Sequence, residues 1–450
     1  MTRFSRDATD TGRRIERALS QGALSAAQLT KSLDISQSTL SRTIHESAHS
    51  IVHFRVTGQR TPLYGLLRSL PAGLNARQRI HRYPDQGHIR PFADGAFLAG
   101  GGTLERAGER TTLYAGLPPY MAFAAPSGFL GQRAAQDAAR DAHFPASLKD
   151  WNNEHRVAWL FTQGLNLPGN LVFGDTALQQ EMHLCAAAPI THAQRAGHYV
   201  AQASTRRTAA FGPSAGGEQP KFLCLVEDRG PVIVKFARRG SRMAPLLGLE
   251  HLALRALGEI GVPAAATRLL SAGDFVFLEV LRFDRVGPLG RIGMLSAGAV
   301  DDEMCGRRDS WSAFAQRCVQ SKILAPGDAL QVDTAAAFSE LIGNTDRHFE
   351  KILLLIDESG EYRGVAPAYD ILPMRYASIG GGLDPELTPI EPKIGDIGPQ
   401  PRVWGPAAHA AGLFWRWART EKLDVPVPLA MKKLAAKNLA VAREFSEPLL

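Results

Sequence analysis

The 450-residue sequence has few cysteines and no long uninterrupted apolar run. Its four cysteines are far apart in the chain: Cys185, Cys224, Cys305 and Cys318. This spacing excludes a C-x-x-C redox pair, the usual clustered zinc sites and a dense disulfide framework. We therefore expect reduced thiols and a cytoplasmic protein.

Signals for membranes and export are also missing. The most apolar long stretch, residues 116–131, is interrupted by three prolines and is too short to span a bilayer. The opening MTRFSRDATD lacks the apolar segment of a signal peptide. Hydrophobic residues make up 45% of the chain, enough for large cores, so a mainly disordered class is excluded as well. At this length we expect two or three globular domains.

Basic residues are concentrated at the N-terminal end. The net charge is +7, and residues 1–90 contain fourteen Lys and Arg against six Asp and Glu, while the rest of the chain is nearly neutral. Such an asymmetry predicts a nucleic-acid-binding end joined to a neutral body.

The N-terminal pattern is helix, turn, helix, hairpin. Residues 25–33 carry Leu29 and Leu33 on one face, and after a short turn Ser36 is suited to cap a second helix over residues 37–49. The outer face of that second helix is polar and holds one arginine. It comprises Gln37, Ser38, Ser41, Arg42 and His45.

A helix with such a face fits a DNA major groove, where its first residues reach base edges. Residues 51–67 predict a β-hairpin with Arg60 near its tip, placed like a wing that contacts phosphate. A small helical bundle used for dimerisation is the alternative, but the charge and the hairpin favour double-stranded DNA. The segment resembles the winged helix-turn-helix of bacterial regulators.

The middle of the chain shows no catalytic pattern. Residues 69–82 are expected to form a connection, residues 88–125 a small antiparallel sheet, and residues 129–159 helices interrupted at Pro145. A short strand is expected within residues 169–175. We expect a scaffolding or docking role for this part.

The C-terminal half holds a pattern typical of nucleotide chemistry. A loop of small residues, 212–221, leads into two strands over residues 222–236, and Lys235 lies in the second strand. A helix follows at residues 246–260, with Glu250 on its apolar stripe. A buried acid needs a partner, and protein kinases pair a strand Lys with a helix Glu beneath a Gly-rich loop. The order therefore predicts a Lys235–Glu250 pair.

Two carboxylates flank a later hairpin. Asp346 precedes the strands expected over residues 352–365, and Asp370 follows them, so both are expected to face one site. Kinases use one Asp at the substrate hydroxyl and a second Asp to hold Mg²⁺. Either Asp alone would be assigned to a loop or a cap. No H-E-x-x-H, G-x-S-x-G or G-x-x-x-x-G-K-[ST] motif offers a competing chemistry.

Five motifs in this order resemble the HipA-family serine/threonine kinases, the toxins of bacterial toxin–antitoxin systems. They are SAGGEQPK at 214–221, VIVKF at 232–236, RFDR at 282–285, NTDRH at 344–348 and AYD at 368–370. The resemblance covers about residues 90–450. The fused N-terminal winged helix is similar to the YjjJ (HipH) branch of that family.

The resemblance implies an α+β protein in which a winged helix-turn-helix precedes a two-lobed, protein-kinase-like body. We expect three domains: a DNA-binding domain at 1–85, an N-terminal kinase lobe with a small sheet and the phosphate-binding loop at 86–285, and a mainly helical C-terminal lobe at 286–450.

The resemblance also assigns roles. Ser214 matches an autophosphorylated loop serine, and the expected catalytic residues are Asp346, Lys235 and Glu250. The expected ATP contacts are Ala215, Gly216, Gly217, Glu218, Gln219, Lys221, Lys235, Glu279, Arg282, Phe283 and His348, and Asp370 would bind Mg²⁺. One position departs from the family, because Lys351 stands where a second Mg²⁺ ligand, Asn, is usual. A Lys ammonium only donates and cannot bind a cation.

Two functions follow. The first is an ATP- and Mg²⁺-dependent protein serine/threonine kinase toxin with a fused, autoregulatory DNA-binding domain. Its implied partners are DNA, a protein substrate such as an aminoacyl-tRNA synthetase, and an antitoxin. The alternative, which Lys351 favours, is a transcriptional regulator whose kinase-like body is weakly active or inactive.

Overall fold

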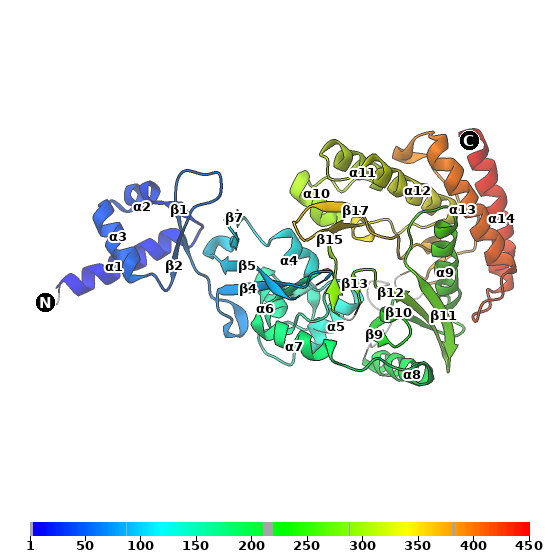
Figure 1. The fold of residues 1–450 in the computed structure, drawn as a ribbon, viewed down its shortest axis with the longest axis horizontal. Helices are drawn as coiled ribbons and strands as arrows, with labels where there is room; N and C mark the ends of the chain where they lie inside the picture. The colour runs from blue at the N-terminus through cyan, green and yellow to red at the C-terminus, as the bar shows by residue number, and fades with distance from the viewer. Residues whose placement is uncertain (1–2, 87, 210–218, 288, 380–382) are drawn as a thin grey trace. The chain divides into compact units, whose positions relative to one another are not determined.

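The computed structural model describes residues 3–86, 88–209, 219–287, 289–379 and 383–450. The chain divides into two compact units (Figure 1), the first made of residues 1–126 and 131–185 and the second of residues 127–130 and 186–450. The domain boundaries expected after residues 85 and 285 stay predictions. In the part that the structure describes, no helix is long and apolar enough to cross a membrane.

The first unit begins with three helices, α1 (Arg3–Leu19), α2 (Ala26–Leu33) and α3 (Gln37–Glu46). The Ser25 hydroxyl accepts from the N–H of Gln28 at the start of α2, and Ser36 caps α3 in the same way. The three helices pack around Ile15, Leu29 and Leu40. Both helices expected from the sequence are present, the second ending three residues early.

A hairpin follows the helices and has both faces covered. Its sheet has the order β1 (Leu24–Ser25), β3 (Leu63–Leu66), β2 (Ile51–Phe54). On β2, Ile51 joins the helical core, whereas Val52 and Phe54 pack with Leu98 and Leu104 of the next sheet. The hairpin is therefore held between the helices and that sheet, and its connecting turn is left exposed.

The second sheet of this unit has five strands in the order β7-β6-β5-β4-β8. They are β4 (Arg77–Arg82), β5 (Arg90–Phe97), β6 (Thr103–Ala107), β7 (Arg110–Tyr114) and β8 (Leu171–Phe173). The expectation of a mere connection up to residue 82 is wrong at its end, because β4 lies inside this sheet. The signal was weak because β4 has a single apolar residue, Ile80, and pairs with β8 far along the chain.

Helices cover one face of this sheet. They are α4 (Pro119–Ala124), α5 (Gly128–Ala138) and α6 (Asn153–Gln163), whereas α7 (Asp175–Cys185) packs through Ala177 against Val172 on the opposite face, at the β8 edge of the sheet. Short 3₁₀ turns lie at η1 (Pro71–Gly73), η2 (Ala99–Gly101) and η3 (Leu148–Asp150). Ile80 and Phe97 from the sheet pack with Leu160 and Phe161 of α6. The antiparallel sheet and the helices expected in this region are thus present.

The second unit contains the four-stranded sheet β11-β12-β10-β9 with α8 (His192–Ala209) and α9 (Met243–Glu259). Its strands are β9 (Lys221–Val226), β10 (Gly230–Arg238), β11 (Thr267–Ala272) and β12 (Phe275–Leu281). Phe277 on one face of β12 joins Tyr199 of α8, whereas Leu278 on the other face joins Leu247 of α9. Each face of the sheet therefore has its own core.

The remainder of this unit is mainly helical. A two-stranded ribbon, β13 (Arg285–Val286) and β14 (Gly290–Arg291), leads to the sheet β15 (Gly293–Ser296), β16 (Leu353–Ile356), β17 (Tyr362–Val365). The helices are α10 (Ala297–Met304), α11 (Trp311–Gln320), α12 (Pro326–Ile342), α13 (Pro401–Thr420) and α14 (Leu429–Ser446), and the 3₁₀ turns are η4 (Phe349–Lys351), η5 (Met374–Tyr376), η6 (Gly395–Ile397) and η7 (Glu447–Leu449). In Figure 1, α13 and α14 run side by side.

Candidate functional site

The ion pair expected between Lys235 and Glu250 is present. Lys235 lies on the face of β10 toward α9, because Val234 and Phe236 fill the core on the opposite face. Its Nζ donates to Glu250 Oε1 at 2.6 Å, and the Glu250 side chain is only 1% exposed. Burial lowers the pKa of Lys235, but the carboxylates of Asp370 and Glu250 outweigh burial and hold that pKa above its ordinary value. Lys235 therefore stays charged.

Asp370 brings a second carboxylate to Lys235. Its backbone has φ 56°, the left-handed region that few residues other than glycine adopt. Its carboxylate accepts from the Nζ atoms of both Lys235 and Lys351. Burial would raise the pKa of Asp370, but the ammonium groups of Lys235, Lys351 and Lys221 hold it well below its usual range. Asp370 is therefore an ionised carboxylate among three lysines.

Asp346 stands at the start of a polar loop. Helix α12 ends at Gly343, whose φ of 77° turns the chain. The buried Asn344 then accepts from the backbone N–H of Asp346 at 3.2 Å, which fixes the loop. The Asp346 side chain is 36% exposed, against 17% for Asp370. Sequence reasoning gave Asn344 no role, although an Asn two residues before an Asp is a usual loop-fixing arrangement.

Lys351 points into the site. It ends the short turn η4, and its Nζ lies 3.2 Å from Asp346 Oδ2 and also pairs with Asp370. Burial lowers the pKa of Lys351, but the carboxylates of Asp370 and Asp346 outweigh burial and hold that pKa above its ordinary value. Its ammonium thus bridges the two carboxylates that the sequence predicted to face one site.

This bridge bears on metal binding. Mg²⁺ needs several oxygen ligands at short distance, and each of the two carboxylates is engaged with the same ammonium. Among the residues that the structure describes, no group of three or more His, Cys, Asp or Glu side chains is placed to hold a metal ion. The arrangement does not fit a metal ion between Asp346 and Asp370.

The phosphate-binding side is partly described. Lys221 begins β9 directly opposite Lys235 on β10. Burial lowers the pKa of Lys221, with Asp370 acting against it and the neighbouring lysines with it. The Gln219 side-chain amide donates to the carbonyl of Phe236. The predicted autophosphorylation site Ser214 and the predicted ATP contacts Ala215, Gly216, Gly217 and Glu218 lie outside the described residues.

Phe283 comes close to this cluster, whereas Arg282 is engaged elsewhere. The Phe283 ring lies 5.9 Å from that of Tyr369, the residue before Asp370. Arg282 is buried and donates from Nε and Nη2 to the two oxygens of Asp284, at 3.0 and 2.8 Å. Arg282 therefore has a structural partner of its own, and its predicted contact with ATP stays a prediction.

Glu279 has its side chain on the face of β12 away from Lys235. Lys235 is paired with Leu278 in the sheet, so the next residue along β12 faces α8. There Glu279 accepts from the Tyr199 hydroxyl at 3.0 Å and lies 3.5 Å from Arg195 and from Arg229. The side chain serves this buried ion cluster, which leaves only its backbone for the predicted adenine contact.

His348 and the predicted DNA contacts are exposed. His348 Nε2 lies 3.5 Å from Asp346 Oδ1, and its Nδ1 lies 3.0 Å from Glu350.

On α3 the residues predicted to contact DNA are all exposed, as is Arg60 in the hairpin turn. These predicted contacts on α3 are Gln37, Ser38, Ser41, Arg42 and His45. Sequence reasoning missed a second basic surface, formed by Arg77, Arg79 and Arg106, because it did not predict β4.

Comparison with known proteins gives two domain matches. Residues 213–422 match the HipA-like C-terminal domain, and residues 74–182 match the middle domain of YjjJ-like toxins. Over 441 residues the chain is 29% identical to Toxin YjjJ of Escherichia coli (strain K12), covering 95% of this chain and 97% of that protein. The matches place the Lys235, Asp346 and Asp370 cluster inside the HipA-like region.

Two solved structures are also similar. HipA of Shewanella oneidensis MR-1, solved with HipB and operator DNA, has a TM-score of 0.48 at 14% identity, covering 82% of this chain and 97% of that chain. The Helicobacter pylori proinflammatory kinase CtkA has a TM-score of 0.37 at 12% identity, covering 52% of this chain and 90% of that chain.

Proposed function

We propose that the second unit is an ATP-dependent protein serine/threonine kinase of the HipA-like type and that the N-terminal helices bind double-stranded DNA. The kinase proposal depends on one observation: Lys235 is held between the carboxylates of Glu250 and Asp370. Lys351 links Asp370 to Asp346, which brings Asp346 to the same site. The HipA-like match over residues 213–422 supports it. The similarity to Toxin YjjJ supports a role as a toxin.

Three lysines offer the charge for nucleotide phosphates. Lys221, Lys235 and Lys351 surround Asp370, and phosphate oxygens can replace carboxylate oxygens as partners of an ammonium group without leaving the charges unpaired. Phosphoryl transfer depends mainly on such positioning and charge stabilisation. The Phe283 and Tyr369 rings lie beside the cluster and provide an apolar surface for the adenine.

Asp346 is suited to the substrate hydroxyl because it is the most exposed of the three carboxylates described here. In the proposed step it accepts the proton of a serine or threonine hydroxyl, whose oxygen forms a bond to the γ-phosphorus. The bond from the γ-phosphorus to the β,γ-bridging oxygen breaks, and ADP leaves. Lys351 holds Asp346 in place from one oxygen.

Mg²⁺ usually accompanies ATP in this chemistry. Because the ammonium of Lys351 stands between the carboxylates that would bind the ion, the proposed transfer step uses only groups of this chain and ATP. The proposed neutralisation of the phosphates therefore depends on the lysines of this chain.

The same observation favours a second candidate function. If the Lys351 bridge persists when nucleotide is bound, Asp346 and Asp370 remain engaged and the unit binds nucleotide without transferring phosphate. The protein would then be a DNA-binding regulator that responds to nucleotide.

Labelled phosphate transfer from γ-labelled ATP by the full chain separates the two candidates, together with the melting temperature measured with ATP. A kinase transfers phosphate in the wild type, and Asp346→Asn abolishes transfer while retaining the stabilisation by ATP. A regulator shows the stabilisation without transfer. A wild type with neither transfer nor stabilisation contradicts both.

The DNA proposal depends on the exposed polar face of α3. Selection of duplexes from a random pool by the full chain should give a sequence preference. Arg42→Ala should weaken binding to the selected site more than binding to random DNA, because base contacts carry the specificity. Equal weakening on both would make Arg42 a phosphate contact. A duplex from the gene's own promoter tests autoregulation.

A further inference from the structure

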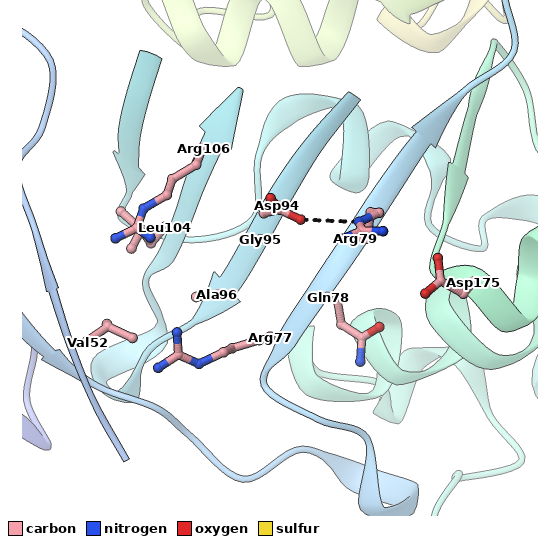
Figure 2. A pocket seen from close by; sticks show the side chains of 10 residues that line it. All are labelled: Val52, Arg77, Gln78, Arg79, Asp94, Gly95, Ala96, Leu104, Arg106 and Asp175. Carbon is pink, nitrogen blue, oxygen red and sulfur yellow. Dashed lines mark ion pairs between the residues drawn. The ribbon is translucent and has the colours of Figure 1, made fainter. Parts of the chain in front are cut away.

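The first unit carries a hollow of about 420 Å³ on the sheet face opposite α4, α5 and α6. Figure 2 shows its lining, with side chains from β4, β5 and β6, from β2 of the N-terminal hairpin and from the start of α7. Its charged members are Arg77, Arg79, Arg106, Asp94 and Asp175. We call Arg77, Arg79 and Arg106, with Asp94 between them, the arginine hollow.

The strand register puts the three arginines on one face. Asp94 of β5 pairs with Arg79 of β4 on one side and with Arg106 of β6 on the other. Arg77 lies two residues before Arg79, and therefore on the same face. Ile80, the residue after Arg79, points to the opposite face, where it packs in the core under the helices. Strands β4 and β6 thus present guanidinium groups to the same open space, on either side of Asp94 on β5.

These arginines are poorly neutralised. Arg79 lies 3.5 Å from Asp94, and the two side chains are 54% and 71% exposed, so their attraction is weak. Arg106 donates to the backbone carbonyl of His53, which carries no net charge, at 3.2 Å. The Arg77 guanidinium has no side-chain partner among the described residues. Asp175, across the hollow, is engaged by His81 at 2.7 Å.

The hollow is continuous with the predicted DNA-binding elements. Val52 of β2 lines it, and Arg106 bonds to His53 of the same strand. The hairpin turn is tied to β7 by two hydrogen bonds between Thr57 and Thr111, at 2.8 and 2.9 Å. The arginines are therefore held in a fixed relation to the hairpin.

We propose that the arginine hollow contacts the phosphates of DNA that is bound by the N-terminal helices; the inference rests on the proposed DNA binding. The planar guanidinium fork matches two phosphate oxygens. A small anion would remain largely hydrated against such exposed side chains, whereas a polyanion gains from releasing counterions along its length. These contacts position the duplex and carry no sequence preference.

The test measures DNA affinity of the full chain against salt concentration, by fluorescence anisotropy with the selected duplex extended at both ends. Arg77→Ala and Arg79→Ala should each lower the slope of log affinity against log salt by about one unit. Arg77→Lys should keep most of the slope because the charge is kept. Arg140→Ala is the matched control, since Arg140 is an exposed arginine of the same unit outside the hollow.

The outcomes separate this inference from the proposal on which it rests. If Arg42→Ala alters sequence preference while Arg77→Ala and Arg79→Ala leave the slope at the wild-type value, the inference is wrong and DNA binding stands. The arginine hollow would then bind a different acidic partner, or none. If the wild type binds no DNA at low salt, both are wrong. A reduced slope with an unchanged base preference supports the inference.

Discussion

The two basic clusters of the chain differ in how their charges are neutralised. In the second unit, Lys235 and Lys351 are nearly buried and each contacts two carboxylates. In the first unit, Arg79 has one distant carboxylate and Arg77 has none among the described residues. Burial explains the difference, since a charge removed from water needs a close partner and an exposed charge does not.

The residue types follow the same division. A Lys ammonium is a compact charge on a flexible stem, which suits a site where the partner changes from carboxylate to phosphate. An Arg guanidinium is planar and remains charged, which suits a surface that meets phosphates of a long polyanion. The comparison leads us to expect large stability effects from the lysine cluster and salt-dependent binding effects from the arginine hollow.

The largest expected effect comes from Lys235→Met. This change leaves the buried Glu250 without its lysine partner and Asp370 with Lys351 alone, so the free energy of unfolding should fall by about 3–5 kcal/mol. Urea denaturation of the full chain measures it. Lys235→Met combined with Glu250→Met should recover much of the loss, because the uncompensated charge at Glu250 is removed. A single variant as stable as the wild type would show that the two charges are not coupled.

The response to salt is the second prediction. Three arginine–phosphate contacts should lose about 40-fold in affinity between 50 and 200 mM salt, from a slope of about 0.9 per contact. The destabilisation by Lys235→Met should hardly change over the same range, because buried pairs are little screened. Anisotropy and urea denaturation at matched salt give the two numbers. A salt-sensitive Lys235→Met effect would mean that the lysine cluster is open to solvent.

Lys351→Asn is the third prediction. It replaces the bridging ammonium with a side chain whose oxygen can bind a cation. The Mg²⁺ concentration needed for half-maximal stabilisation by ATP should fall about tenfold, since a nearby positive charge no longer opposes the ion. Lys351→Met, which loses the charge without gaining an oxygen, is the control and should shift less. Coinciding Mg²⁺ titrations for wild type and Lys351→Asn would show that Lys351 leaves the site when ATP binds.

The main contacts of the lysine cluster were predictable because local patterns fix them. Lys235 in a strand and Glu250 on an apolar helical stripe must both face the layer between sheet and helix, and there they pair. A hairpin brings its two ends together, so Asp346 and Asp370 converge. The direction of Lys351 depends on the short turn η4 and on a choice of rotamer, which no sequence period encodes.

The side-chain direction of Glu279 could have been predicted from the alternation of residues along a strand. Once Lys235 was assigned to the site face, sheet pairing required alternate residues of β12 to share that face, and Glu279 falls on the other one.

The arginine hollow was missed for a different reason. Strand β4 shows a single apolar residue, Ile80, and is completed by β8, which comes about ninety residues later in the chain. Long-range pairing of a polar strand leaves little local trace.

The smallest expected effect comes from the carboxylate inside the arginine hollow. Asp94→Asn keeps the shape of the side chain and removes the negative charge that is paired with Arg79. Exposed ion pairs are worth about 0.2–1 kcal/mol, so freeing Arg79 should tighten DNA binding about 1.4- to fivefold at low salt, and the gain should vanish at high salt. Asp150→Asn, at an exposed position of the same unit outside the hollow, should change nothing. Weaker or unchanged binding by Asp94→Asn at 50 mM salt would place the bound DNA away from the arginines, because a carboxylate next to a phosphate contact must oppose it.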